Sequence, residues 1–377
     1  VSQSDIQDIL DQFTSGTYDL VTSTFGEPSD VDGNGKVIFL FTHLVDQVGD
    51  VAGFYASGSL FDVDRGGDGN LADMMYISPT RPPESYQSLL AHEYQHLINF
   101  YQHAMARDGD AEETWLNEAL SHYTEDLVDG HIAGGNAQLV DTYLQHPGLF
   151  TLTSDVSPLY GGNRGAAYLF LRGLVDEYGT DLVGNLVQTD RTGVPNAEAA
   201  SGRSFDDLLG SFSARLFLSG TGVSSTSGHN YTYRYLTEPQ TGYRSMPLPA
   251  ESSLTAQGAS TTGYLKPASP AYVRLSGSGQ GIPVEIQVDA SGSFSALLIA
   301  LDKHFVPNLA LPVDFFQGLT LDSPFPGVFV PGEPVTISGS AADSTATQAI
   351  LEFSPLGGAT DEISFQAYIT GGRFSKS

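Results

Sequence analysis

Apolar positions in the first third of the chain fall at both helical and strand-like spacings. Residues 5–25 carry apolar side chains three and four positions apart, which predicts one or two amphipathic helices. Residues 36–41 form a short apolar run between turn-forming residues, which predicts a buried strand, and residues 52–59 and 72–78 predict two more. Residues 86–105 keep a helical period without Pro or Gly and form the clearest helix of the chain.

Three further helices are predicted downstream. The stretch 111–128 follows Asp110, with Glu113 three residues later, a spacing typical of the capping box that starts a helix. Helical spacing recurs over residues 165–178 and 204–218. Together with the strands, these helices indicate an α+β domain with a small mixed sheet.

The character of the chain changes beyond about residue 225. Stretches rich in Ser, Thr, Gly and Pro separate short alternating segments, a spacing typical of an all-β sandwich of about 120 residues. These segments are residues 271–275, 284–288, 297–301, 335–338 and 363–370. We therefore predict an α+β domain over residues 1–225, a linker over 226–250 and a β-rich accessory domain over 251–377.

The charge balance narrows the classes of partner. Among 377 residues, 16 Lys and Arg face 44 Asp and Glu, which gives a formal net charge of -28. This acidity opposes approach to a phosphate backbone or an anionic lipid surface, so nucleic acid is not an expected partner. No window approaches the roughly 18 apolar residues of a membrane span. Because the first residues lack a charged and then apolar leader, we expect an extracellular protein whose signal peptide has been removed.

The clearest chemical motif is His92-Glu93-Tyr94-Gln95-His96, inside the helix predicted over residues 86–105. The chain has no Cys, so any metal must be held by His, Asp or Glu. Two histidines four residues apart project from one helix face and can reach one ion, while Glu93 points beside it towards a metal-bound water. We therefore predict that His92 and His96 bind Zn²⁺. A chance occurrence of the spacing is the alternative.

The next predicted helix offers a third ligand. Catalytic zinc commonly has three protein ligands and keeps a fourth position for water. Glu118 lies among apolar neighbours in the segment 115–122, where an unpaired carboxylate would be costly. Coordination of a metal would remove that cost, so Glu118 is the predicted third ligand. The alternative is an ordinary exposed glutamate.

These two segments together resemble a known family. The His-Glu-x-x-His motif, followed by Asn-Glu-Ala-Leu-Ser at residues 117–121, is similar to the thermolysin-like gluzincin zinc metallopeptidases and, more narrowly, to the hyicolysin-type neutral metalloproteases. The resemblance is specific over residues 88–126 and looser over 30–218. It implies a zincin catalytic domain and a secreted zinc endopeptidase that cleaves protein or peptide substrates, with a zinc-activated water and Glu93 as general base.

One position departs from the family pattern. Thermolysin-like enzymes have an Asp four residues after the glutamate ligand, and this Asp orients a zinc histidine. This chain has His122 at that position. Either His122 or Glu125, one turn further along the same face, is expected to take over the orienting hydrogen bond.

Peptide hydrolysis also requires a hydrogen-bond donor for the developing oxyanion. Tyr160 is the predicted donor, because its surroundings are typical of a loop that leads into a helix and gluzincins commonly use Tyr or His there. The other candidates are Tyr168, Arg164, His131 and His146. By analogy with the family, residues 52–57 are the expected edge strand for an extended peptide.

Two further possibilities remain open. The Asp-, Gly- and Asn-rich loops at residues 30–36 and 62–73 suit Ca²⁺, and Asp73 is the twelfth residue counted from Asp62, but ordinary turn chemistry also explains both loops. The alternative function is a non-catalytic, zinc-containing surface-binding protein whose β domain recognises a partner. Glu93 separates the two functions, because a purely structural site needs no carboxylate beside an open position.

Overall fold

The computed structural model describes residues 2–48, 51–129, 134–154, 161–219, 227–231 and 266–275, together with short strands between residues 252 and 374. The chain divides into two compact units. The first comprises Val1–Leu144 and Phe150–Gly202, and the second comprises Gln145–Leu149 and Arg203–Ser377. The linker predicted over residues 226–250 lies outside the described residues except for 227–231, so the predicted domain boundaries stay a prediction.

A continuous helical segment opens the first unit. Helices α1 (Gln3–Gln12) and α2 (Tyr18–Phe25) are joined by a π-helical turn at Phe13–Thr17. The Ser2 hydroxyl accepts the Asp5 N–H, and the Asp5 carboxylate accepts the Ser2 N–H, so a capping box starts the segment. The helical segment predicted over residues 5–25 is confirmed.

The sheet of the first unit has three strands in the order β1-β3-β2. Strand β1 (Ile38–Phe41) runs parallel to β3 (Met74–Ile77), and β2 (Gly53–Tyr55) runs antiparallel to β3. The three predicted strands are confirmed, but β1 is not buried as expected, because Ile38 and Leu40 are 37% and 41% exposed. Strand β2 is shorter than expected because a 3₁₀ turn occupies Ser57–Leu60. The sheet is mixed and small, in agreement with an α+β fold.

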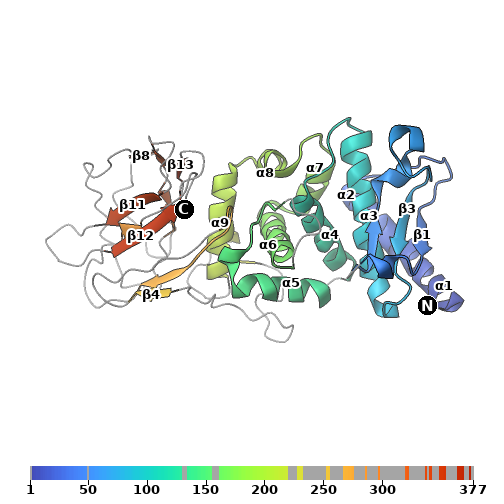
Figure 1. Cartoon of the computed structure of the whole chain (residues 1–377), viewed down its shortest axis with the longest axis horizontal. Coiled ribbons are helices and arrows are strands. Elements are labelled where there is room, and N and C mark those ends of the chain that lie inside the picture. Colours follow the sequence, from blue (N-terminus) through green and yellow to red (C-terminus); the bar gives the residue numbers. More distant parts are fainter. Residues whose placement is uncertain are drawn as a thin grey trace. The chain divides into compact units, whose positions relative to one another are not determined.

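Helix α3 (Tyr86–Phe100) continues through a π-helical turn at Tyr101–Met105, which confirms the helix predicted over this stretch. It packs against β2 on one side and against α4 (Thr114–Asp129) on the other, and α4 packs in turn against α6 (Gly161–Tyr178). Figure 1 shows this succession from the sheet through α3 and α4 to α6. The site described below lies between α3 and α4.

The predicted capping box before α4 is wrong. The helix begins at Thr114, so Asp110, the expected cap, lies four residues before the first helical residue. The Glu113 carboxylate accepts the indole N–H of Trp115 at 2.8 Å. The Glu112 carboxylate accepts the backbone N–H of Gly193 at 2.6 Å.

Three helices of the first unit were not predicted: α5 (Gly134–Gln145), α7 (Asp181–Val187) and α8 (Gly193–Ser201). The second unit contains α9 (Phe205–Leu218), where the Ser204 hydroxyl accepts the Asp207 N–H, as expected for the last predicted helix.

Short strands account for the rest of the described second unit. They are β4 (Ser252–Leu254), β5 (Val273–Leu275), β6 (Glu285–Ile286), β7 (Ala296–Leu297), β8 (Leu319–Leu321), β9 (Thr336–Ile337), β10 (Gly339–Ala341), β11 (Gln348–Phe353), β12 (Ile363–Tyr368) and β13 (Arg373–Phe374). Strands β11 and β12 pair antiparallel over six residues each. The β-rich accessory domain and its sandwich arrangement stay a prediction, because most of the residues that connect these strands lie outside the description.

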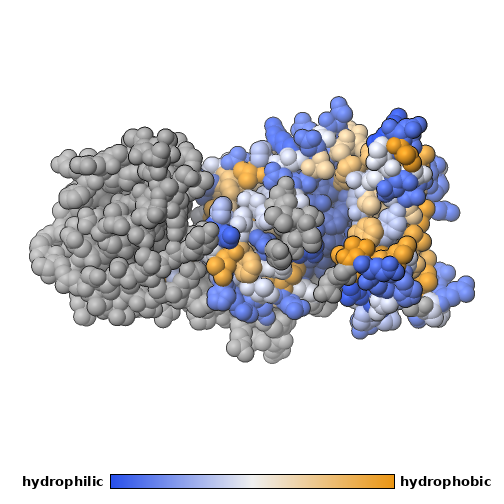
Figure 2. Space-filling model, in the orientation of Figure 1, coloured by the Kyte–Doolittle hydropathy of each residue, from blue (hydrophilic) through white to orange (hydrophobic). Residues whose placement is uncertain are grey.

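The described surface mixes hydrophilic and hydrophobic patches, as Figure 2 shows for one face. Its most exposed large apolar side chains are Val63, Leu44 and Val48, with exposed fractions of 71%, 66% and 65%. Within the described ranges, every helix is too short or too polar to cross a bilayer.

Candidate metal centre

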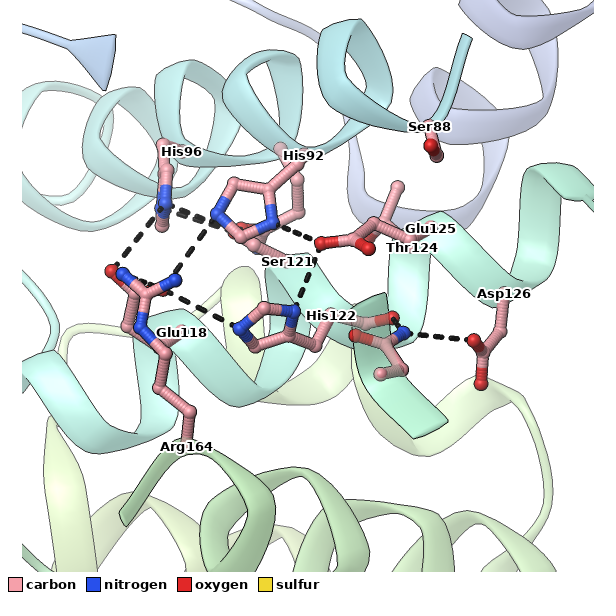
Figure 3. Close-up of polar contacts among 12 residues, drawn as sticks. Ser88, His92, His96, Glu118, Ser121, His122, Thr124, Glu125, Asp126 and Arg164 are labelled. Atoms are coloured by element: carbon pink, nitrogen blue, oxygen red, sulfur yellow. Dashed lines mark hydrogen bonds and ion pairs between the residues drawn. The ribbon is translucent and has the colours of Figure 1, made fainter. Parts of the chain in front are cut away.

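Helices α3 and α4 bring the three predicted ligands together. The Nε2 atom of His92 lies 3.6 Å from Oε2 of Glu118, and the Nε2 atom of His96 lies 3.9 Å from Oε1 of the same carboxylate. One ligand atom of each residue lies within 4.8 Å of the others. Figure 3 shows the two imidazoles from α3 and the carboxylate from α4 turned towards one another. The spacing of four residues between the histidines places both rings on one helix face, as expected.

Glu125 orients the first histidine. Its Oε1 atom lies 2.6 Å from Nδ1 of His92 and 2.9 Å from Nδ1 of His122. A carboxylate accepts hydrogen bonds, so each imidazole donates from Nδ1 and turns its Nε2 atom towards the centre. Of the two residues that the sequence left open, Glu125 therefore holds His92, and it holds His122 in the same way.

The second histidine has a neutral partner. Nδ1 of His96 lies 3.0 Å from Oδ1 of Asn117, which also accepts an N–H of Asn99 at 2.9 Å. The hydroxyl of Ser121 lies 3.0 Å from the same Nδ1 and donates to Gln95 at 2.5 Å. The sequence analysis did not identify these partners. Two of them have a position in the sequence that could have indicated the role: Asn99 follows His96 by three residues on the same helix, and Asn117 directly precedes Glu118.

The charges around the centre favour an ionised Glu118. Burial raises the pKa of this carboxyl, but the positive charge of Arg164 and the neighbouring histidines outweighs burial and lowers the pKa to about 2. Nη2 of Arg164, from α6, lies 3.1 Å from Oε2 of Glu118. Burial together with the charge of His92 lowers the pKa of His96 to about 4, so its ring is neutral near pH 7. A neutral imidazole and an ionised carboxylate are the forms that bind a metal.

The side chain of Glu93 extends from α3 towards β2, the edge strand of the sheet. It is 5% exposed, and burial raises its pKa to about 7, although a hydrogen bond from the Tyr55 backbone N–H lowers the value in part. Strand β2 passes so close that a Cβ atom at Gly53 would lie 3.4 Å from Cγ of Glu93. The backbone of β2 therefore contacts the residue predicted to act as general base.

The oxyanion candidates fall in different places. Tyr160 and His131 lie outside the described residues, so Tyr160 stays a prediction. His146 is part of the second unit. The hydroxyl of Tyr168 is buried and donates to the carboxylate of Asp126, away from the ligands (Figure 3 labels Asp126). Of the candidates described in the first unit, Arg164 is the one that reaches the centre.

A second group of carboxylates lies near β3. One oxygen each of Asp30, Asp32 and Asp73 falls within 4.8 Å of the others. Asp73 thus joins the loop of residues 30–36 and is not placed as the last ligand of an Asp62 loop, where the Asp62 carboxylate accepts the N–H of Arg65 at 2.9 Å.

Turn hydrogen bonds occupy this acidic group. Asp30 accepts the Gly35 N–H at 3.0 Å, Asp32 accepts the Asn34 N–H at 3.1 Å, and Asp73 accepts the Val31 N–H at 3.0 Å. Asx-type turns explain such contacts without an ion, so Ca²⁺ at this loop stays a hypothesis.

The residues between α3 and α4 fit Zn²⁺. Imidazole nitrogen and carboxylate oxygen are usual zinc ligands. Among the described atoms, Nε2 of His122 is buried without a hydrogen-bond partner. Buried polar atoms are rarely left in this state, and a metal ion beside this nitrogen would give it a partner. Oε2 of Glu118 already has the Arg164 guanidinium at 3.1 Å.

Comparisons with known proteins give one partial match and one negative result. No protein-family model matches the chain. A stretch of 143 residues is 31% identical to the neutral metalloprotease ShpI of Staphylococcus hyicus, covering 34% of this chain and 32% of that protein. The chain therefore spans about a third of the length of the curated relative that it matches. Part of the chain is thus related to a metalloprotease, in agreement with the His and Glu cluster between α3 and α4.

Proposed function

We propose that this chain is a secreted zinc endopeptidase of the gluzincin type, similar to the hyicolysin-type metalloproteases. Its zinc ligands are His92, His96 and Glu118. The observation that carries the proposal is the convergence of these three side chains from two helices, with Glu93 on the same helix as the histidines. The partial similarity to a neutral metalloprotease supports the same conclusion.

Glu93 is the proposed general base. A bound Zn²⁺ supplies a Lewis acid for the scissile carbonyl and lowers the pKa of water at the site. The buried carboxyl of Glu93, with its pKa near 7, is suited to accept a proton and return it to the leaving amine. The Tyr55 N–H fixes the position of this carboxylate.

The partners of the histidines keep the ligands in the required tautomer. Glu125 accepts Nδ1–H of His92, and Asn117 accepts Nδ1–H of His96. Both Nε2 atoms then face Glu118, so the rings are oriented before a metal binds.

Two residues are proposed for the oxyanion. Tyr160 is the donor expected from the family resemblance. Arg164 is the alternative supported by position, because its guanidinium lies beside Glu118 and carries a fixed positive charge. A preorganised donor of this kind is among the larger contributions to acyl-transfer catalysis.

Strand β2 is the proposed docking edge for an extended peptide. It ends the β1-β3-β2 order, so among the described strands its outer edge has no neighbour. Because β2 contacts Glu93, a peptide added as a further strand would run past the proposed base.

Replacing Glu93 by Gln tests the proposal. We expect the wild-type protein to bind about one Zn²⁺ per chain and to hydrolyse casein in a chelator-sensitive reaction. Glu93→Gln should keep the zinc and lose about 10²- to 10⁴-fold in rate, because the amide cannot accept the proton. Glu84→Gln, at an exposed position outside the centre, is the matched control and should keep full activity.

The same experiment distinguishes the endopeptidase from the alternative function. Zinc binding without hydrolysis by the wild-type protein would favour the non-catalytic, zinc-containing surface-binding protein. Unchanged hydrolysis by Glu93→Gln would rule out Glu93 as the base.

A further inference from the structure

His122 faces the same centre as the two predicted histidine ligands. It lies on α4 one turn after Glu118 and is 5% exposed. The centroid of its ring lies 4.9 Å from that of His92, almost the same as the 4.8 Å between His92 and His96. The three imidazoles therefore form one cluster, as Figure 3 shows for His92, His96 and His122 around Glu118.

The orientation of the His122 ring matches that of a metal ligand. Glu125 accepts the Nδ1–H of His122 at 2.9 Å, just as it accepts that of His92. The Nε2 atom of His122 then lies 3.9 Å from Oε2 of Glu118, the same separation as between Nε2 of His96 and Oε1. Each of the three imidazoles thus presents its Nε2 atom to one carboxylate.

The Nε2 atom of His122 lacks a hydrogen-bond partner among the described residues. Because Glu125 occupies Nδ1, Nε2 is the ring nitrogen left for a further partner. At 3.9 Å it is too far from Oε2 of Glu118 for a hydrogen bond, whereas a metal ion between the two atoms would contact both. A histidine with a purely packing role would not need such an arrangement.

We propose that His122 is a further ligand of the metal centre, so that three imidazoles and Glu118 surround one divalent cation. The inference rests on the proposed zinc centre and extends its donor set beyond the family pattern. Because zinc accepts five ligands in some catalytic states, a fourth protein donor is compatible with a water at the site. The sequence position that departs from the family would then add a ligand and would not replace an orienting carboxylate.

X-ray absorption spectroscopy of the zinc-loaded full-length chain tests this proposal without a mutation. Imidazole rings give multiple-scattering features whose amplitude counts the histidines bound to the metal. We expect three imidazoles per zinc. A count of two would overturn the proposal while leaving the zinc centre intact, whereas a wild-type chain that binds no zinc would overturn the proposed function itself.

Cobalt-substituted variants provide a second test. Replacing His122 by Gly should change the visible absorption bands of bound Co²⁺ and raise the dissociation constant by at least about tenfold. Added imidazole should restore the wild-type spectrum by filling the position of the missing ring. Circular dichroism shows whether the His122→Gly variant folds. If it does not fold, His122→Gln, which is a smaller change, replaces it in the Co²⁺ measurement. A folded variant with an unaltered Co²⁺ spectrum would overturn the assignment.

Discussion

Two clusters of possible metal ligands lie in the first unit, and their polar atoms are used in opposite ways. In the acidic loop, Asp30 and Asp32 accept N–H groups from their own turn, and Asp73 is tied to the same loop. Between α3 and α4, by contrast, the shortest contacts of His92 and His96 lie on the Nδ1 side of each ring, at 2.6 and 3.0 Å, and Nε2 of His96 has only a longer contact of 3.4 Å to the Ser121 hydroxyl among the described residues.

The two clusters differ in how many of their ligand atoms remain available to bind a metal ion. The loop carboxylates already bind backbone groups that would otherwise be unpaired, so their arrangement is explained without an ion. The helix pair leaves the Nε2 atoms and a buried carboxylate turned towards one point. Of the two clusters, the one with spare buried ligand atoms is the better candidate for a resident metal.

The largest expected effect comes from removing Glu118. Glu118→Ala should greatly reduce bound zinc and abolish hydrolysis, because Glu118 is the one anionic donor of the proposed ligand set and all three imidazoles face it. Metal analysis after dialysis, with casein hydrolysis in parallel, measures both. Glu84→Ala is the matched control, and retention of zinc by Glu118→Ala would remove this residue from the ligand set.

A smaller loss is expected when an orienting partner is changed. Glu125→Gln should weaken zinc binding by about 10- to 100-fold, because the amide is a poorer acceptor for the Nδ1–H groups of His92 and His122. Competition with a coloured chelator measures the affinity. If zinc binding by the variant equals that of the wild type, the hydrogen bonds do not tune the centre.

Removal of the metal should lower the thermal stability of the protein through the α3–α4 cluster and not through the acidic loop. At zinc about 100-fold above its dissociation constant, binding stabilises the fold by about 2.7 kcal/mol. Thermal unfolding of the chelated protein should therefore occur several degrees lower, and zinc should restore the transition. Calcium added to the chelated protein should leave the transition temperature unchanged. If calcium raised the transition temperature as much as zinc does, the acidic loop would be assigned an ion.

The smallest effect is expected in the acidic loop. Asp32→Asn keeps the size of the side chain but weakens its hydrogen bonds to Asn34, so the free energy of unfolding should fall by about 0.5–1.5 kcal/mol. Zinc content and hydrolysis should stay at wild-type values. Urea denaturation gives the stability change, and a loss of zinc in this variant would contradict the separation of the two clusters.

The approach of His92 and His96 to each other could be predicted from sequence because their spacing is local, and their assignment with Glu118 as metal ligands stays a prediction. A spacing of four residues on a helix fixes the two histidines on one face whatever the rest of the chain does. Glu118 followed from the cost of an unpaired carboxylate among apolar neighbours.

Contacts distant in sequence could not be predicted in this way. The choice between His122 and Glu125 depends on the rotation of α4 against α3, which periodicity does not fix. Asp73 joins a loop about forty residues earlier because β3 runs beside β1, a pairing that no local pattern specifies. The capping prediction before α4 failed because the helix begins only at Thr114 and the Glu113 carboxylate accepts the indole N–H of Trp115.

The position of the ion is the most direct test of the account. Crystals of the zinc-loaded full-length chain, measured at wavelengths on either side of the zinc absorption edge, locate the metal by anomalous scattering. We expect one peak between α3 and α4, within about 2.0–2.2 Å of His92, His96 and Glu118. A zinc peak confined to another part of the molecule, with these three side chains free of metal, would contradict the account.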